Sequence, residues 1–136
     1  MSVVSNDTPH IAALGAWGTV EWAIDSEGGM PAHEFFLKLT DGDKAKVIAL
    51  FQWLAQTGRI SNREKFRRLG SKAGTKGRDL WEFKSFKIRF IGNFRAGGRF
   101  IIANGLFKKA DDLPKREIER TVRILEEHDL RGTETQ

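Results

Sequence analysis

The sequence contains no cysteine and no tyrosine, and only three histidines among its 136 residues. The absence of cysteine excludes disulfides, thiolate metal sites and a cysteine nucleophile. The histidines, at positions 10, 33 and 128, show no metal-ligand spacing, so we expect neither a metal nor any other cofactor. No Gly-rich loop ending in Lys-Ser or Lys-Thr occurs, which argues against nucleotide hydrolysis of that kind.

Long hydrophobic runs are also absent. The longest, Val47 to Leu54, is interrupted by Gln52 and is too short to span a bilayer. The N-terminus does not resemble a signal peptide, because no basic segment precedes an apolar one. These features predict a cytoplasmic protein with no membrane partner. The length fits one domain, placed at residues 16–130 between a flexible N-terminal arm (1–15) and a C-terminal tail (131–136).

Positive charge is concentrated in one central block of the chain, whose net charge is +5. Residues 59–109 carry 15 Lys and Arg against three Asp and Glu, or +12, whereas residues 1–58 and 110–136 carry −4 and −3. Crowded like charges repel one another, so the usual partner of such a block is a polyanion such as RNA. A basic surface that has no partner is the alternative.

Proline, glycine and apolar spacing divide the first half of the chain into elements. Tryptophan and β-branched residues favour a strand near its start. Pro31 suits the first turn of a helix, and Asp41 can cap a longer helix with apolar residues at i, i+3, i+4 and i+7. Gly58 suits the left-handed end of that helix. The predicted elements are a strand at 17–25, helices at 31–39 and from 41 to near 58, and a helical turn at 64–69.

The second half alternates with the period of two that strands show. Apolar and charged residues alternate from Leu80, and the phase reverses at Ser85, which requires a tight turn or a bulge. Glycines 97 and 98 predict a further turn, and Pro114 opens a final amphipathic helix. The predicted strands are 80–84, 86–90 and 99–103. The order of one strand, two helices, a three-stranded antiparallel run and a C-terminal helix predicts an α+β sandwich.

Charged side chains on these strands are candidate catalytic groups. Period-two geometry puts residues 82 and 84 on one sheet face, and residues 87 and 89 together on one face. Cations fixed on a sheet can stabilise the negative charge that grows on a phosphorane, which favours metal-free cleavage of RNA. The same alternation fits the wet face of a half-buried sheet equally well. The candidates are Glu82, Lys84, Lys87, Arg89, Lys108 and Lys109.

Aromatic residues are a second candidate for RNA contacts, because four tryptophans and ten phenylalanines could stack on bases. Most of them fall at periodic apolar positions, which favours packing in the core. Phe94, beside Arg95 on the approach to the glycine turn, stays open as a base-stacking residue.

Three segments together resemble a known family. They are LWEFK (80–84), FKIRF (86–90) and the stretch from RFIIANG (99–105) through LFKKADDLPKREIERTVRILEEH (106–128). This succession of two charged strands, a hydrophobic strand, Phe-Lys-Lys and a helix after Pro resembles the phage-derived HigB-like branch of the RelE toxin superfamily. The resemblance covers about residues 16–128.

The resemblance implies a RelE-like fold and the toxin of a type II toxin–antitoxin pair, an endoribonuclease that cleaves mRNA in the ribosomal A site without a metal. The implied partners are mRNA, the ribosome with its rRNA, and a cognate antitoxin of helix-turn-helix type. The implied catalytic residues are Lys84, Lys87, Arg89 and Lys109, with Glu82 beside them. The implied RNA-binding residues are Arg67, Arg68, Lys72, Lys76, Arg78, Arg95 and Lys108.

The chain departs from the family where proton transfer is concerned. The family often uses Tyr or His as acid or base, and this chain has no tyrosine and no histidine in its predicted strands. A lysine or Glu82 would have to take that role. Two alternatives therefore stand beside the nuclease: a RelE-fold protein that binds RNA or the ribosome without cutting, and a phage accessory protein whose basic face binds an acidic partner.

Overall fold

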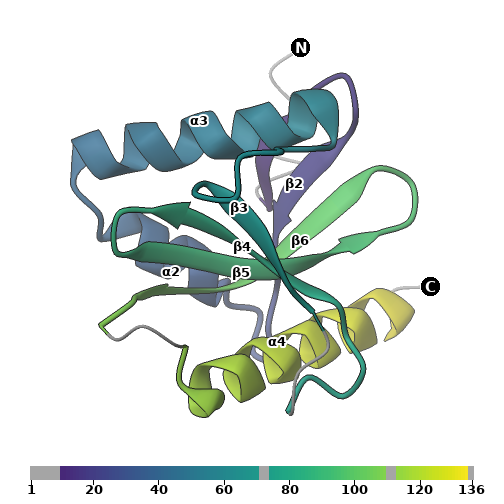
Figure 1. The fold of residues 1–136 in the computed structure, drawn as a ribbon. Helices are drawn as coiled ribbons and strands as arrows, with labels where there is room; N and C mark the ends of the chain where they lie inside the picture. Colours follow the sequence, from purple (N-terminus) through teal and green to yellow (C-terminus); the bar gives the residue numbers. More distant parts are fainter. Residues whose placement is uncertain (1–9, 71–73, 110–112, 135–136) are drawn as a thin grey trace.

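The computed structural model describes residues 10–70, 74–109 and 113–134, and these form an α+β protein built on one mixed sheet (Figure 1). Its strands lie in the order β1-β2-β6-β5-β4-β3, and all neighbours are antiparallel except β2 and β6. The strands are β1 (Ile11–Leu14), β2 (Thr19–Trp22), β3 (Phe66–Gly70), β4 (Leu80–Ser85), β5 (Ile88–Arg95) and β6 (Arg99–Phe107). The helices are α2 (Pro31–Leu37), α3 (Asp41–Thr57) and α4 (Lys115–Glu134).

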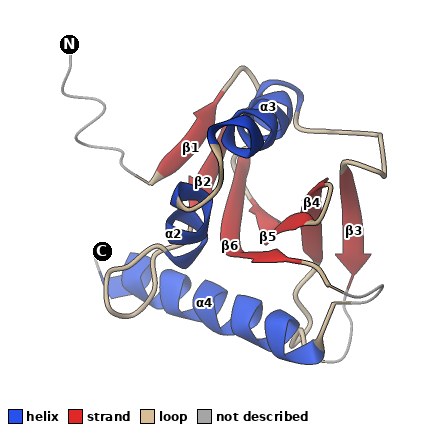
Figure 2. Cartoon of the chain, turned by 90° about the vertical axis from the view of Figure 1, so that its left-hand side faces the viewer, coloured by secondary structure: helices blue, strands red, loops and turns tan. Residues whose placement is uncertain are grey.

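The sheet lies between two helical layers, with α2 and α3 on one face and α4 on the other (Figures 1 and 2). Strand β6 supplies both cores. Its Phe100 and Ile102 belong to the apolar cluster on the α3 side, whereas Ile101 and Ala103 belong to the cluster under α4. Strand β6 is therefore covered on both faces, which its almost continuous apolar run requires.

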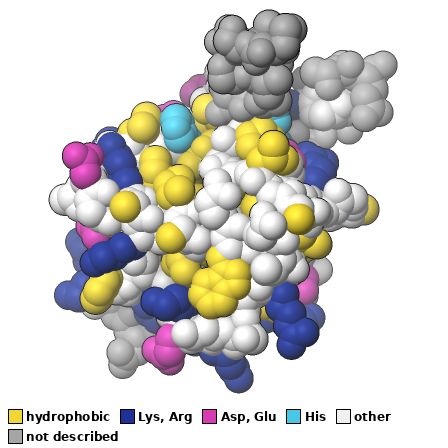
Figure 3. Space-filling view, turned by 90° about the horizontal axis from the view of Figure 1, so that it is seen from above, with side chains coloured by type: hydrophobic (Ala, Val, Ile, Leu, Met, Phe, Trp, Pro, Cys, Tyr) yellow, Lys and Arg dark blue, Asp and Glu magenta, His cyan; other side chains and the backbone are white. Residues whose placement is uncertain are grey.

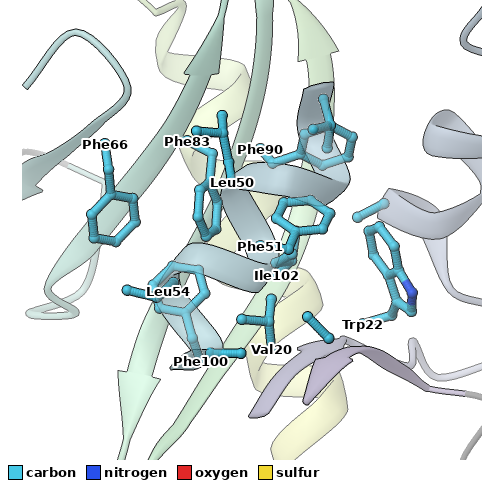
Figure 4. Packing of buried hydrophobic residues seen from close by; sticks show 14 of the residues in the cluster. Val20, Trp22, Leu50, Phe51, Leu54, Phe66, Phe83, Phe90, Phe100 and Ile102 are labelled. Atoms are coloured by element: carbon cyan, nitrogen blue, oxygen red, sulfur yellow. The ribbon is translucent and has the colours of Figure 1, made fainter. Parts of the chain in front are cut away.

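Aromatic rings fill the core between α3 and the sheet. Phe51 of α3 is fully buried and packs edge-on against Phe83 and Phe90, with ring centroids 4.9 and 5.4 Å away (Figure 4). Trp22 of β2 packs at the edge of this cluster, with its ring centroid 5.6 Å from that of Phe51. Such pairs add to the stability gained from burial alone. This core fixes the position of the β4–β5 hairpin relative to α3.

The helices of the first half begin and end close to where the sequence predicts. α2 starts at Pro31 and ends two residues before the predicted boundary. α3 ends at Thr57 and is capped by Gly58, whose φ of 73° is the left-handed conformation that glycine favours. The predicted cap is wrong by one residue: the side chain of Thr40, not Asp41, accepts a hydrogen bond from the N–H of Asp43 at 3.2 Å.

The described sheet contains two strands that the sequence analysis did not predict. Residues 11–14, assigned there to a flexible arm, form the edge strand β1. Residues 66–70, where a helical turn was expected, form β3, and that expectation is wrong. Phe66 and Leu69 are spaced like a helical stripe, but they enter the two different cores on opposite faces of a strand.

The phase reversal at Ser85 is a tight turn. β4 ends at Ser85 and pairs there with Ile88, so that only Phe86 and Lys87 form the connection. Strand β6 runs four residues beyond its predicted end, and α4 extends to Glu134, into the segment assigned to a tail. No helix in the described part of the chain is long and apolar enough to cross a bilayer.

Candidate functional site

The β4–β5 hairpin and the end of β6 bring the predicted catalytic cations together. Lys84 of β4 pairs in register with Arg89 of β5, which in turn pairs with Leu106 of β6. The backbone N–H of Lys108 donates to the carbonyl of Lys87 in the turn at 2.7 Å. Lys109 follows and is exposed. We call this cluster the hairpin-end site and define it as Lys84, Lys87, Arg89, Lys108 and Lys109.

A cavity of about 510 Å³ opens beside the hairpin on the side of α3. Two exposed aromatic residues, Trp53 (41%) and Phe86 (78%), line it together with Lys84. Lys46 of α3 and Lys65, which precedes β3, also line it, and Lys46 Nζ lies 4.6 Å from the centre of the Phe86 ring. Figure 3 looks onto this side of the molecule and shows hydrophobic side chains lying among Lys and Arg at the surface. Cations and ring faces thus share one hollow.

Sequence reasoning missed Lys46 and Lys65, although Lys46 had a signal in the sequence. Lys46 shares one face of α3 with Leu50 and Trp53, at i, i+4 and i+7, so it had to lie beside whatever that face approaches. The carbonyl of Lys65 accepts a hydrogen bond from the N–H of Lys84 at 2.8 Å. That contact could have been found only if β3 had been recognised as the neighbour of β4.

Glu82, two residues before Lys84 on β4, is fully buried. Its Oε1 accepts a hydrogen bond from Arg67 Nε at 2.8 Å, and its Oε2 lies 3.8 Å from Arg89 Nε. In the described part of the chain neither Oε2 nor Arg89 Nε has a hydrogen-bond partner. A carboxylate with no exposed surface cannot touch a substrate, so Glu82 holds the two arginines in place instead.

Arg89 is held against the hairpin turn. Its Nη1 donates to the carbonyls of Phe86 and Ile88, at 2.6 and 2.9 Å. Burial lowers the pKa of Arg89, Glu82 opposes that effect, and the charge of Arg67 adds to it. An arginine nevertheless keeps its charge at neutral pH. Arg89 therefore places a fixed positive charge in the turn, next to the exposed Lys87.

Most of the other predicted RNA-binding cations are paired with acids. Burial alone would raise the pKa of Asp129 on α4, but hydrogen bonds from Arg95 and Arg78 lower it. Lys72 lies outside the described residues. The ion pairs are Arg68 with Asp79, Lys76 with Glu126, and both Arg78 and Arg95 with Asp129. These cations support the packing of α4 and of the segment before β4, and they do not join the hairpin-end site.

The histidines also lie elsewhere. His10 approaches Glu21, His33 packs on Trp22, and His128 accepts a hydrogen bond from the backbone of Ile24. Across residues 10–70, 74–109 and 113–134, no three His, Asp or Glu side chains gather as metal ligands. The hairpin-end site is thus a site of lysines, one arginine and nearby rings.

Comparison with known proteins adds no relative. The chain matches no protein-family model and no curated protein. What the fold and the site define is an α+β protein with cations and exposed rings gathered at one end of its sheet.

Proposed function

We propose that the protein is a metal-independent endoribonuclease of the RelE type that binds and cleaves RNA at the hairpin-end site. The observation that carries the proposal is the gathering of the five cations from β4, the turn, β5 and the end of β6, beside a hollow that exposes Trp53 and Phe86. Single-stranded RNA matches both features, because its phosphates attract cations and its bases stack on rings.

In the proposed reaction the 2′-oxygen of one nucleotide attacks the adjacent phosphorus and passes its proton to the amine of one lysine of the hairpin-end site. The bond from phosphorus to the 5′-oxygen breaks, and that oxygen takes up a proton. The products are a 2′,3′-cyclic phosphate and a 5′-hydroxyl, so atoms balance without a further reactant. Negative charge grows on the phosphoryl oxygens in the transition state, and preorganised cations stabilise it more strongly there than in the ground state.

The exposure of each residue determines its proposed role in the reaction. Lys84, Lys87 and Lys109 are the proposed catalytic residues: their ammonium groups reach phosphate from solvent, and one of them protonates the leaving oxygen. Arg89, fixed against the turn, supplies a positive charge whose position does not change during the reaction. Glu82 is a positioning residue that acts through Arg89.

The activity belongs to a wider proposal, that the protein is the toxin of a type II toxin–antitoxin pair. In this proposal it cleaves mRNA in the ribosomal A site in the cytoplasm, and a cognate antitoxin of helix-turn-helix type silences it. The support is the resemblance of residues 16–128 to the HigB-like branch, and an α+β fold is compatible with it.

Induced expression in a bacterial host, with mapping of mRNA 5′ ends, tests the proposal. Wild type should arrest growth and cut mRNA in register with codons, and the variant Lys84→Ala/Lys87→Ala/Lys109→Ala should do neither. The matched control Lys115→Ala/Arg116→Ala/Arg120→Ala removes the same charge from exposed positions on α4 and should behave as wild type. Arrest and cutting that survive in the hairpin-end variant would refute the assignment of the site.

A second candidate is a RelE-fold protein that binds RNA or the ribosome without cutting it. The burial of Glu82 and the distant places of the histidines favour it, because they leave proton transfer to lysine alone. It predicts folded wild-type protein that co-purifies with RNA or ribosomes yet causes no arrest and no cuts. Recovery of neither RNA nor ribosomes would point to an acidic protein partner instead.

A further inference from the structure

A second cavity, of about 540 Å³, lies between the loop that follows α3 and the outer strands of the sheet. Residues 58–61 and Arg63 line one side, and β3, β4 and β5 contribute the other. It shares no lining residue with the cavity of the hairpin-end site. Its volume is within the range of roughly 300–1,000 Å³ that is usual for small-molecule sites.

Three aromatic residues from three neighbouring strands line this cavity. Trp81 stacks on Phe66, with ring centroids 5.1 Å apart and planes at 20°. Phe94 meets Trp81 edge-on at 5.5 Å and 86°. Phe66 is buried, whereas Trp81 and Phe94 keep part of their surface exposed. The rings are fixed by one another and by the sheet, so they offer ring surface without first having to be ordered.

The rim of the same cavity is cationic. Arg59 and Arg63 are exposed and form no ion pair within the described part of the chain. Arg68 also lines the cavity, and its side chain stays 63% exposed although it pairs with Asp79. Among the residues that the structure describes, no Asp or Glu lines the cavity. The cavity thus combines unpaired positive charge at its rim with aromatic surface inside.

We propose that this cavity binds one unpaired nucleobase of an RNA strand, stacked on Trp81 and edge-on to Phe94, while Arg59 and Arg63 bind the flanking phosphates. Stacking on rings and phosphate contacts from arginines are the two interactions that hold single strands without reading their sequence. We call it the base pocket and define it as Arg59, Arg63, Phe66, Trp81 and Phe94. The inference rests on the proposed function, in which RNA is the ligand.

The base pocket is well placed to hold the strand that reaches the hairpin-end site. Arg63 and Phe66 line the base pocket, whereas Glu64 and Lys65, between them in the chain, line the other cavity. Trp81 and Lys84 are three residues apart on β4, or about 10 Å at ~3.3 Å per residue. That distance corresponds to about three stacked nucleotides at ~3.4 Å each. A hexanucleotide is therefore long enough to span this separation along β4.

The test measures binding without cleavage, using a fluorescein-labelled 2′-O-methyl hexanucleotide, which lacks the attacking hydroxyl. Arg59→Ala/Arg63→Ala should weaken its binding about tenfold, a loss typical of two phosphate contacts in moderate salt. Arg116→Ala/Arg120→Ala removes the same charge from the exposed side of α4 and should bind as wild type. In NMR spectra the indole N–H signal of Trp81, assigned with Trp81→Phe, should shift on titration, whereas that of the buried Trp22 should not.

Equal binding by the two double variants, or a Trp81 signal that does not move at saturation, would overturn the proposal. So would a hexaglutamate peptide that binds as well as the oligonucleotide and shifts the same signal, because the pocket would then fit an acidic protein. A base pocket that passes these tests in a protein that never cuts RNA would leave the pocket standing and refute the nuclease. If the lysine variant stops cutting RNA but Arg59→Ala/Arg63→Ala binds the oligonucleotide as wild type does, the nuclease would stand and the base pocket would be refuted.

Discussion

Among single residues, Glu82 has the largest effect on the charges of the site, because it holds two arginines in place. It is fully buried, with Arg67 and Arg89 on its two oxygens. We expect Glu82→Gln to lower the free energy of unfolding by about 3 kcal/mol, because removing one partner leaves two buried or half-buried arginine charges uncompensated. Urea denaturation measures this loss. Glu64→Gln, at an exposed position nearby, should change stability by less than about 0.5 kcal/mol. Equal losses in both variants would show that Glu82 has no such role.

His128 makes the stability of the fold depend on pH. Its Nδ1 accepts a hydrogen bond from the N–H of Ile24 at 3.0 Å, which the protonated ring could not do. Burial lowers the pKa of His128 below its ordinary value of 6.5, and Arg95 and Arg99 add to that, while Asp129 and Glu21 oppose it. The unfolded chain therefore binds the proton more readily, so this contribution to stability is complete above about pH 6.5 and is lost as the pH falls below it.

His128→Gln should remove that part of the pH dependence. A glutamine oxygen can still accept from Ile24 but does not titrate, so thermal unfolding between about pH 7.5 and 5.5 should change less for this variant than for wild type. His33→Gln leaves the hydrogen bond to Ile24 intact and should keep the wild-type dependence. If His128→Gln and wild type lost stability in parallel over this range, the histidine would not be its source.

The β4–β5 hairpin is the element on which the site depends, and its turn is strained. Phe86 has a φ of 55°, a conformation that bulky residues rarely adopt, and it is 78% exposed. Phe86→Gly should therefore raise the free energy of unfolding by about 1 kcal/mol, by relieving strain worth roughly 1–3 kcal/mol. Lys87 has no positive φ, so Lys87→Gly should lower stability by about 0.5–1 kcal/mol. Chemical denaturation of both variants tests this contrast, and a loss of stability in Phe86→Gly would contradict it.

Elements with a clear period could be predicted from the sequence, and elements that depend on a distant partner could not. The apolar run of β6 and the alternation of β4 follow from burial on sheet faces, so these strands were found. The strand predicted at 86–90 is β5 at 88–95, because Phe86 and Lys87 form the turn. β3 was missed because Phe66 and Leu69 imitate a helical stripe while facing opposite cores. β1 is short and rich in alanine, and it is ordered by its pairing with β2 and by the burial of Ala13 in the core on the α3 side, neither of which the local sequence indicates.

The candidate site also contains features that could be predicted from the local sequence and features that depend on distant residues. Lys84, Lys87, Arg89 and the two lysines after β6 could be predicted because they belong to adjacent strands of one antiparallel run. The burial of Glu82 against Arg67 and Arg89 could not be predicted, because charged and apolar residues alternate around it as they do on a strand with one exposed face. The acids that pair with Lys76, Arg78 and Arg95 come from α4, about 30 to 50 residues away in the chain.

Across the molecule as a whole, some cations are neutralised by acids and others are not. The acids of α4 pair with the cations before β4 and at the end of β5, whereas the lysines around the hairpin remain without ion pairs in the described part of the chain. Binding of a single-stranded 2′-O-methyl oligonucleotide should therefore weaken steeply with salt. Five phosphate contacts correspond to a slope of about −3.5 in log affinity against log salt concentration.

The Lys84→Ala/Lys87→Ala/Lys109→Ala variant should reduce the magnitude of that slope by about 2, since each lost phosphate contact accounts for about 0.7. Fluorescence anisotropy at several potassium chloride concentrations measures both slopes. The matched variant of α4, Lys115→Ala/Arg116→Ala/Arg120→Ala, should keep the wild-type slope. An equal reduction in both variants would mean that RNA responds to net charge and not to the hairpin-end site.

The most direct test of the central claim is the chemistry of the cut ends. Ribosomes programmed with a defined mRNA are incubated with purified protein, and the 3′ end of the upstream fragment is identified by mass spectrometry. We expect a 2′,3′-cyclic phosphate, and no cut when the nucleotide 5′ to the cleaved bond is replaced by its 2′-deoxy form. A 3′-hydroxyl end, with cutting that persists at the 2′-deoxy position, would contradict it.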